Sequence, residues 1–350
     1  MSKIKVFLGG YINYTNAQNL NCRAVAEYLD NDKFDVFALT THFGKNERFK
    51  ANTFNCFRPF RFSKHLGFLW GIFNCDVAYL PKHVDTPLWV LKLAKILKKP
   101  IFTTIEGNVT DFSQEHCLPK LFGGIERMEK HFSYFDKIYA ITKHLINQTS
   151  ISLSIEEIPL YLGVNTSHFT PVISKELKSI VFIGRLIKRK GIEDLILLTT
   201  CYPNIKFNII GADSKINKFD NNTSSNIIFH GRLSHIEINL VLKQSDILFV
   251  PSKSEGFPKV ILEAASAGIP SIVYYTYGAS NWMKHRRNGF IVNNFNEVRD
   301  IVNELLNDAL NQDPSQMMVQ NIAEQIRKSA FHIENSVDPL GEIQTLINTL

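Results

Sequence analysis

The feature that most constrains the fold is an alternation of short apolar runs with amphipathic stretches along most of the chain. This alternation is typical of parallel β-sheets covered by helices, because the crossover between parallel strands is usually a helix. The sequence therefore predicts an α/β protein with two doubly wound units. The expected strands are residues 3–9, 34–40, 76–81, 100–105, 137–142 and 155–161 in the first unit, and 179–185, 205–211, 226–231, 246–251 and 270–275 in the second.

Chain length and one segment rich in turn residues indicate where the two units meet. At 350 residues the chain exceeds the ~100–200 residues of an ordinary domain. The stretch YLGVNTSHFTPVISKE, residues 161–176, carries Gly163 and Pro171 and has the composition of a linker. We expect a first domain at 1–165, a second at 166–325, and a helix at 326–350 that packs back onto the first. Ligands bind beyond the carboxyl ends of parallel strands, so we expect the active site in a cleft between the two sheets.

Composition and the first residues predict where the protein resides. Hydrophobic residues make up 45% of the chain and charged residues 21%, and no apolar run approaches the ~20 residues of a membrane-spanning helix. The start, MSKIKVFLGG, passes directly into a strand pattern and has no apolar region of the signal-peptide type. We therefore expect a cytoplasmic protein.

Metal and disulfide chemistry has little support in the sequence. The cysteines form no CxxC pair and no cluster with histidine, so we expect them to be buried apolar residues: Cys22, Cys56, Cys75, Cys117 and Cys201. Asp30 and Asp32 spell D-x-D, a pattern that can hold a divalent metal, but they precede the predicted strand 34–40 instead of following it. We interpret this pattern as a turn and predict no metal.

The net charge of +6 is concentrated in the first half of the chain, above all in residues 45–73. Cations alternate there with aromatic side chains: Lys45, Arg48, Lys50, Arg58, Arg61 and Lys64 among Phe49, Phe54, Phe57, Phe60, Phe62, Phe68 and Trp70. One interpretation is peripheral contact with an anionic membrane, because the cations suit lipid headgroups and the rings suit the interface. The other is a solvated basic loop over core aromatics. We do not expect nucleic-acid binding, since the rest of the chain lacks a matching basic face.

The segment FIGRLIKRKG, residues 182–191, brings two cations to one point. Gly184 ends a predicted strand, Arg185 lies at its carboxyl tip, and Lys190 precedes Gly191 at a helix start. A diphosphate suits this arrangement, because arginine offers a planar fork, lysine a compact charge, and the helix N-terminus its free amides. The alternative is a solvated basic turn.

The segment PSKSEGFPKVILEAASAGIPSIV, residues 251–273, places one carboxylate on a loop and another inside an apolar helix. Glu255 lies on the loop, whereas Glu263 lies in a helix that is apolar on nearly every side. Burying Glu263 without a partner would cost roughly several kcal/mol or force it to take up a proton. The two hydroxyls of a ribose would suit this carboxylate, and an ion pair with Lys259, four residues earlier, is the alternative.

Taken together, these segments resemble a known family. The resemblance is carried by YLGVNTSHFTP, GRLIKRKG, FHGRLSHIEI and the E-x7-E spacing of Glu255 and Glu263. These motifs are similar, in the same order, to those of the retaining glycosyltransferases of family 4. The resemblance is strong over residues 160–275 and weak over the first 150. It implies the GT-B fold, in which two Rossmann-like domains face each other across a cleft.

The resemblance also implies a role for each matching residue. Arg185 and Lys190 correspond to the pair that neutralises the donor diphosphate, and Glu255 to the glutamate that holds the transferred sugar. These three are the expected catalytic residues, while Glu263 corresponds to the glutamate that binds the ribose. The other implied donor contacts are Gly9 and Gly10 in a glycine loop after the first strand, Gly231 and Arg232 at the nucleobase, and Gly256, Phe257 and Pro258 at the sugar and phosphate.

The first domain departs from the family at one position near the expected donor sugar. Members often carry a histidine after the strand that corresponds to IFTTI, but here Glu106 begins EGN. Glu106 is a candidate contact for the acceptor or the sugar, with a turn or capping role as the alternative. The glycine loop GGYINYTNAQN is also unusually polar, so the acceptor preference of the family does not transfer.

The resemblance predicts a reaction and its substrates. We expect transfer of a hexose or N-acetylhexosamine from a nucleotide sugar to a glycan acceptor, with retention and without a metal, in bacterial cell-surface polysaccharide or lipid-linked glycan synthesis. No cofactor is implied, because the nucleotide sugar is a substrate, and a UDP-sugar is favoured over a GDP-sugar. Two other functions stay open: a nucleotide-sugar epimerase of the same fold and a non-catalytic module that binds nucleotide sugars.

Overall fold

A computed structural model of the chain describes residues 2–107, 109, 117–149, 153–160, 163–164, 166–172, 176–211, 225–277, 281 and 283–310. The chain divides into two compact units between Leu162 and Gly163. The helix predicted at 326–350 lies outside the described residues.

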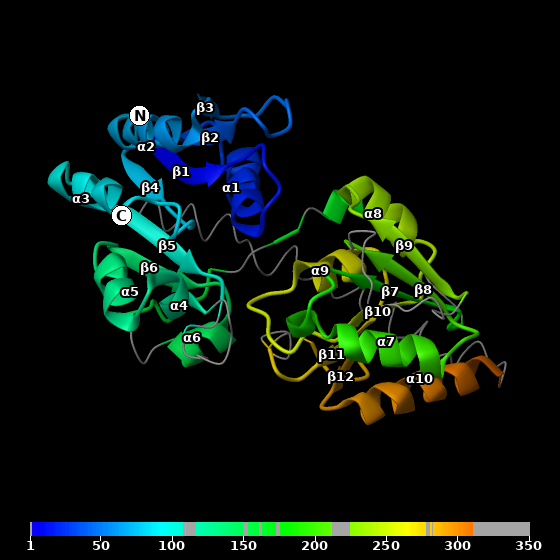
Figure 1. Ribbon diagram of the computed structural model, residues 1–350. Coiled ribbons are helices and arrows are strands. Elements are labelled where there is room, and N and C mark those ends of the chain that lie inside the picture. Colours follow the sequence, from blue (N-terminus) through cyan, green and yellow to red (C-terminus); the bar gives the residue numbers. More distant parts are fainter. Residues whose placement is uncertain are drawn as a thin grey trace. The chain divides into compact units, whose positions relative to one another are not determined.

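The first unit is a parallel β-sheet with helices packed against it (Figure 1). Its elements are β1 (Ile4–Tyr11), α1 (Ala17–Tyr28), β2 (Phe34–Thr41), β3 (Asn52–Cys56), α2 (Phe60–Asn74), β4 (Val77–Tyr79), α3 (Leu88–Ile96), β5 (Ile101–Ile105), α4 (Leu118–Phe122), α5 (Ile125–Phe132), β6 (Lys137–Ala140) and α6 (Lys143–Thr149). The six strands lie in the order β3-β2-β1-β4-β5-β6, and all neighbours are parallel. The winding therefore reverses between β1 and β4, as in a doubly wound sheet.

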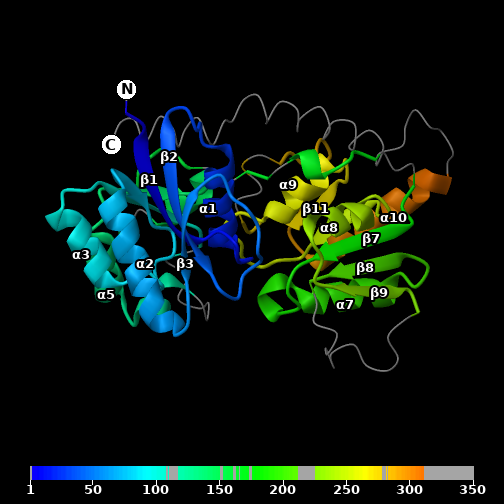
Figure 2. The same cartoon turned by 90° about the horizontal axis from the view of Figure 1, so that it is seen from above.

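Two apolar layers hold this sheet between its helices. One layer joins the sheet to α2, α3 and α5 through Phe68, Leu91 and Phe132, all fully buried. The other joins it to α1 through Val25 and Leu29. Helices α1 and α2 accordingly lie on opposite faces of the sheet (Figure 2). Each such side chain contributes about 1.5–3 kcal/mol on burial, so the two layers are the main source of the unit's stability.

The second unit repeats the topology of the first. Its elements are η1, a 3₁₀ helix (Thr166–His168), β7 (Ser179–Ile183), η2, a 3₁₀ helix (Lys188–Lys190), α7 (Ile192–Cys201), β8 (Lys206–Ile210), β9 (Ile227–Gly231), α8 (His235–Leu242), β10 (Ile247–Val250), α9 (Lys259–Ser266), β11 (Ser271–Tyr274), β12 (Phe290–Val292) and α10 (Phe295–Leu310). The parallel strands lie in the order β12-β11-β10-β7-β8-β9. The reversal of winding falls between β10 and β7, and the predicted doubly wound α/β fold is confirmed.

Two pairs of helices cover the second sheet. The hydroxyl of Tyr202, at the end of α7, donates to Asn303 Oδ1 of α10 at 2.8 Å, and these helices lie side by side. Helix α8 begins with a capping box between Ser234 and Glu237 and approaches α9 through His235. Figure 1 shows the two pairs on opposite sides of the strands.

The strand predicted at residues 155–161 is wrong. Residues 153–160 form no strand, although Glu156 N–H donates to Ile138 O and Leu160 N–H donates to Ala140 O, both at 2.9 Å. The segment thus follows the edge of β6 without forming a ladder, because Pro159 has no N–H to donate and Ile158 faces solvent.

Most of the basic, aromatic stretch 45–73 is strand or helix. It contains β3, an exposed edge strand that the sequence did not predict, and most of α2, which buries Phe68 and Ile72 against the sheet. The solvated-loop interpretation therefore holds for residues 45–51, which lie outside helix and strand, and is wrong for most of the rest of the stretch. The three-residue strand β12 was also not predicted.

The cysteine prediction holds for four of the five residues. Cys22, Cys56, Cys75 and Cys117 are buried, whereas Cys201 at the end of α7 is exposed. All five are free thiols.

Candidate functional site

The carboxyl ends of β7 and β10 lie next to each other at the point where the winding of the second sheet reverses, because the two strands pair directly. Doubly wound sheets bind ligands at this switch point. The segment 184–191 leaves β7, and the segment 251–258 leaves β10. The three predicted catalytic residues, Arg185, Lys190 and Glu255, lie on these segments, together with Gly256, Phe257 and Pro258.

The two segments pack backbone against backbone. Gly191, between η2 and α7, has φ of +74°, and a Cβ there would lie 2.0 Å from the carbonyl oxygen of Pro251. Only glycine fits this position, since it tolerates both the left-handed conformation and the close approach. Lys253 N–H donates to the carbonyl oxygen of Arg189 at 2.9 Å. The turn after β7 is therefore fixed to the loop after β10.

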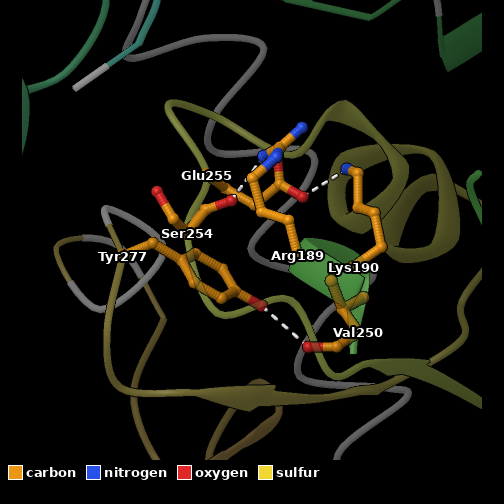
Figure 3. A network of polar contacts seen from close by, with 6 residues as sticks. All are labelled: Arg189, Lys190, Val250, Ser254, Glu255 and Tyr277. Carbon is orange, nitrogen blue, oxygen red and sulfur yellow. Dashed lines mark hydrogen bonds and ion pairs between the residues drawn. The ribbon is translucent and has the colours of Figure 1, made fainter. Parts of the chain in front are cut away.

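A network of charges joins the side chains of the same two segments (Figure 3). Lys190 forms an ion pair with Glu255, whose side chain is only 10% exposed. Arg189 Nη1 donates to the carbonyl oxygen of Ser254 at 2.7 Å and lies 3.8 Å from Glu255 Oε2. At ~4 Å and an effective dielectric constant near 20, each cation contributes on the order of 4 kcal/mol before desolvation. Two cations thus compensate one little-exposed carboxylate.

The other cations of this turn face solvent. Arg185 is exposed and lies two residues after the end of β7. Lys188 has 78% of its side chain exposed and lies 3.7 Å from Glu193 of α7. The structure therefore brings Lys190 and Glu255 together, adds Arg189, which the sequence did not single out, and leaves Arg185 at the solvent boundary.

The loop that carries Glu255 rests on a buried tyrosine. The hydroxyl of Tyr277 donates to Val250 O at 3.0 Å, at the end of β10, and the side chain is fully buried (Figure 3). Burial, and after it the charge of Glu255, raises the pKa of this hydroxyl well above its usual value. Gly256 and Phe257 are half-buried in the loop, and Pro258 precedes the first residue of α9.

Glu263 is the buried carboxylate that the apolar helix predicted. It is 8% exposed on α9, and burial raises its pKa to about 7 although Lys259 lowers it. His235 of α8 lies with Nε2 3.6 Å from Glu263 Oε1. Because 42% of the His235 side chain is exposed, water screens this contact. Burial is therefore the main cause of the raised pKa of Glu263.

The nucleobase residues predicted at the end of β9 lie beside two other strand ends. Gly231 closes β9, and its carbonyl oxygen accepts from Gly211 N–H at 2.6 Å, just after β8. Gly184 N–H, just after β7, donates to Ile210 O at 3.0 Å. Arg232 follows Gly231 and is exposed. A glycine thus ends β9 or directly follows β7 and β8 at the carboxyl edge of the sheet.

The glycine pair of the first unit does not follow its strand. Strand β1 runs through Tyr11, and its register with β2 shifts over Gly9 and Gly10. A Cβ at Gly9 would lie 2.5 Å from Leu80 Cδ2, and one at Gly10 would lie 2.7 Å from Cys22 Sγ. The predicted loop position is wrong, because strand pairing continues past the glycines, and Leu80, just after β4, and Cys22 of α1 approach them closely. Their contact with a phosphate stays a prediction.

Glu106 directly follows β5 and is held by α1. Its Oε1 accepts from Asn21 Nδ2 at 2.8 Å, and Asn21 is 3% exposed. The charge of Glu106 also adds to the effect of burial in raising the pKa of Cys22, the thiol that lies against Gly10. Glu106 and the glycine pair therefore lie around the same part of α1.

The D-x-D sequence forms a turn, as predicted. Asp30 Oδ1 accepts from Asp32 N–H at 2.9 Å, and Asp30 Oδ2 lies 3.3 Å from Lys33 Nζ, between α1 and β2. In the described part of the chain, no group of three or more histidine, cysteine, aspartate or glutamate side chains is placed to hold a metal ion.

Comparison with known families supports the resemblance found in the motifs. Residues 164–327 match the family model described as "Glycosyl transferases group 1". This segment contains the switch-point loops, Glu255 and Glu263, so the predicted resemblance to GT-B glycosyltransferases is confirmed for it.

Curated proteins match about half of the chain. An uncharacterized glycosyltransferase of Methanocaldococcus jannaschii is 30% identical over 183 residues, which cover 49% of this chain and 50% of that protein. The UDP-Gal:alpha-D-GlcNAc-diphosphoundecaprenol alpha-1,3-galactosyltransferase of Escherichia coli is 28% identical over 203 residues, which cover 52% of each. The chain spans about half the length of the curated relatives it matches.

Solved structures match the whole chain in fold. Sucrose-phosphate synthase of Thermosynechococcus elongatus has a TM-score of 0.77 at 15% identity and covers 99% of both chains. The Anabaena protein HepE in complex with UDP-glucose has a TM-score of 0.76 at 16% identity and covers 100% of both. At these identities the likeness shows the fold alone, which is the GT-B arrangement of two parallel sheets.

Proposed function

We propose that the chain is a glycosyltransferase that moves a hexose or N-acetylhexosamine from a nucleotide-sugar donor to a glycan acceptor. The observation that carries the proposal is the network of Arg189, Lys190 and Glu255 at the switch point of the second sheet. Such a site offers cations to a leaving diphosphate and a carboxylate to sugar hydroxyls. The family match over residues 164–327 supports the same reaction.

Each predicted residue has a role in this proposal. Lys190 and Arg185, with the free amides at the start of α7, meet the charge of the diphosphate as the sugar leaves. Glu255 accepts hydrogen bonds from hydroxyls of the transferred sugar, and Glu263 accepts them from the ribose. The other proposed contacts are Gly231 and Arg232 at the nucleobase, Gly256, Phe257 and Pro258 at the sugar and phosphate, and Gly9, Gly10 and Glu106 of the first unit on the acceptor side and at the phosphates.

We further propose that the reaction retains the anomeric configuration and needs no metal or cofactor. The acceptor hydroxyl attacks the anomeric carbon from the face that the diphosphate leaves. The bond from that carbon to the phosphate oxygen breaks, the bond to the acceptor oxygen forms, and the acceptor proton passes to the departing phosphate. The cations of the site carry the charge that builds on the phosphate.

The proposed donor is a UDP-sugar in preference to a GDP-sugar, and the proposed acceptor is a glycan, free or lipid-linked. The solved HepE complex holds UDP-glucose, and the name of the Escherichia coli relative states a UDP-Gal donor and a lipid diphosphate acceptor. These names support the choice of probes: UDP-glucose, UDP-galactose, and undecaprenyl-diphosphate-linked sugars.

Peripheral contact with an anionic membrane on the cytoplasmic side belongs to the same proposal. Helix α2 buries one face and exposes Phe62 (58%), Leu69 (36%) and Phe73 (59%) along another. Arg58 and Arg61 precede or begin this helix, so cations adjoin the exposed apolar stripe, as an interfacial helix requires. Among the helices in the described residues, none combines the length and apolar character needed to cross a bilayer.

Vesicle co-sedimentation tests the membrane contact. Replacing Arg58, Arg61 and Lys64 with alanine is expected to reduce binding to vesicles that contain anionic lipid, because each cation near such a surface contributes about 1 kcal/mol. The matched control replaces Lys120, Arg127 and Lys130, three exposed cations of the same unit. Equal binding by both triple variants would remove the basis for this contact.

Product analysis tests the reaction itself. The protein is incubated with each nucleotide sugar, with and without a lipid-linked acceptor, and the products are separated and identified. A product that requires the acceptor and keeps the anomeric configuration supports the proposal. An isomerised donor would identify an epimerase instead, and donor binding without any product would identify a binding module.

A further inference from the structure

Three consecutive cations of η2 have three different surroundings. The exposed fraction of the side chain falls from 78% for Lys188 to 33% for Arg189 and 19% for Lys190. In a 3₁₀ helix each residue turns the chain by about 120°, so neighbouring side chains point in different directions. Lys188 points to solvent, Lys190 pairs with Glu255, and Arg189 reaches the loop after β10.

Arg189 holds that loop through both its backbone and its side chain. Its carbonyl oxygen accepts from Lys253 N–H at 2.9 Å. Its Nη1 donates to Ser254 O at 2.7 Å, a bond that Figure 3 shows. These two bonds bracket the peptide between Lys253 and Ser254, directly before Glu255. The same Nη1 lies 3.8 Å from Glu255 Oε2. The guanidinium therefore contacts both the backbone and the charge of the carboxylate residue.

We propose that Arg189 is a positioning residue that holds Glu255 for the donor sugar while Lys190 binds the diphosphate. This inference rests on the proposed function. A diphosphate and Glu255 both attract Lys190, so the carboxylate needs a second cation once Lys190 turns to the phosphate. Arg189 provides it from a place already fixed by the Ser254 carbonyl.

The chemistry of arginine suits this role better than that of lysine. A guanidinium has five N–H donors in a rigid plane, so it can bond a carbonyl oxygen and remain beside a carboxylate at once. An ammonium group at the same position would keep the charge but would not reproduce the fork. Arg189→Lys is therefore expected to restore part of what Arg189→Ala loses.

The main test compares the affinities for UDP and for a UDP-sugar, because Glu255 would contact only the sugar. Isothermal titration with UDP, UDP-glucose and UDP-galactose is run on the wild type, Arg189→Ala, Arg189→Lys and the neighbouring control Lys188→Ala. For Arg189→Ala, binding of the preferred UDP-sugar is expected to weaken about 10- to 100-fold and that of UDP less than about threefold. Arg189→Lys should fall between, and Lys188→Ala should match the wild type.

A second readout needs no nucleotide. Amide hydrogen exchange of the peptide that contains residues 252–257 is expected to be at least about tenfold faster in Arg189→Ala than in the wild type or Lys188→Ala. The side-chain bond to Ser254 is lost in that variant, while the second sheet remains folded. Unchanged exchange in this loop would contradict the proposal that Arg189 holds it in place.

The outcomes separate the role of Arg189 from the function of the protein. An equal loss of UDP and UDP-sugar affinity in Arg189→Ala would make Arg189 a phosphate ligand or a general support, and unchanged affinities would leave it without a role at the site; either result overturns the proposal. A wild-type chain that binds no nucleotide would overturn the proposed function. It would overturn this role of Arg189 as well, even if hydrogen exchange of residues 252–257 were faster in Arg189→Ala.

Discussion

The two units share one sheet topology but place their polar contacts differently. In the second unit, Lys190 and Glu255 join the two loops that leave the switch-point strands. In the first unit, the equivalent edge of the sheet is joined to α1, since Tyr11 N–H donates to Asn19 Oδ1 at 3.0 Å and Glu106 accepts from Asn21. The shared topology thus sets where a site lies, while the segments that follow the strands decide which polar groups lie there.

The largest expected effect concerns the charged site of the second unit. Lys190→Ala should lower turnover about 10²- to 10³-fold, because the cation would stabilise charge that develops on the leaving diphosphate. The first unit holds a comparable lysine, Lys82, with 10% of its side chain exposed and 2.6 Å from Asp85. Lys82→Met should leave UDP affinity unchanged. A larger loss of UDP affinity from Lys82→Met than from Lys190→Ala would contradict the placement of the diphosphate in the second unit.

The next effect concerns the fit between the two switch-point segments. Gly191→Ala should lower the free energy of unfolding of the second unit by about 3 kcal/mol, because φ is +74° and the Cβ would meet Pro251 O. Gly107→Ala in the first unit is the control, since nothing lies within 4 Å of its added Cβ. It should cost less than about 0.5 kcal/mol. Denaturant unfolding followed by hydrogen exchange measures both, and equal costs would refute the close packing at Gly191.

The two units should also respond to pH in opposite directions. Glu263 has a folded pKa of about 7 against an ordinary value of 4.5. As pH rises from 4.5 to 7, the unfolded carboxyl loses its proton before the folded one, so the second unit loses up to about 3 kcal/mol of stability. Glu263→Gln should flatten this dependence when unfolding is measured at pH 5 and pH 7. A variant that keeps the wild-type slope would assign it to another group.

The first unit should lose stability in acid. Burial lowers the pKa of His83 to about 3 and that of His131 to about 4, from an ordinary 6.5. As pH falls below 6.5, the histidines of the unfolded chain take up protons, while those of the folded chain stay neutral. At pH 5 each histidine therefore lowers the free energy of unfolding of the first unit by up to about 2 kcal/mol. His131→Phe, placed among Phe122, Phe132 and Phe135, should remove its share. Hydrogen exchange of α5 at pH 5 and pH 7 measures it; an unchanged acid response would exclude His131.

Much of the fold could be predicted because buried parallel strands are nearly continuous apolar runs. β10 and β11, which lie inside the second sheet, have only buried residues. The edge strand β3 could not be predicted this way, because Asn52, Thr53 and Asn55 are exposed and leave no apolar run. The segment 155–161 gave the opposite error, since apolar residues were present but Pro159 prevents a regular ladder.

Site residues could be predicted from the sequence where a side chain differs in type from those next to it in the chain. They could not be predicted where adjacent side chains carry the same charge. Glu263 stands out as a carboxylate in an apolar helix, and its burial is confirmed. Arg189 was missed although Lys190 was predicted, because Lys188 and Arg189 carry the same charge and the sequence does not show which of them reaches the loop after β10. The geometry of η2 decides that, together with the close contact of Gly191 with Pro251.

The most direct measurement is a crystal structure of the protein with its preferred nucleotide sugar. We expect a pyrophosphate beside Lys190 and the first amides of α7, a ribose at Glu263, and a sugar at Glu255. A nucleotide bound elsewhere, or one that leaves Lys190 paired with Glu255 and touches neither, would contradict this expectation.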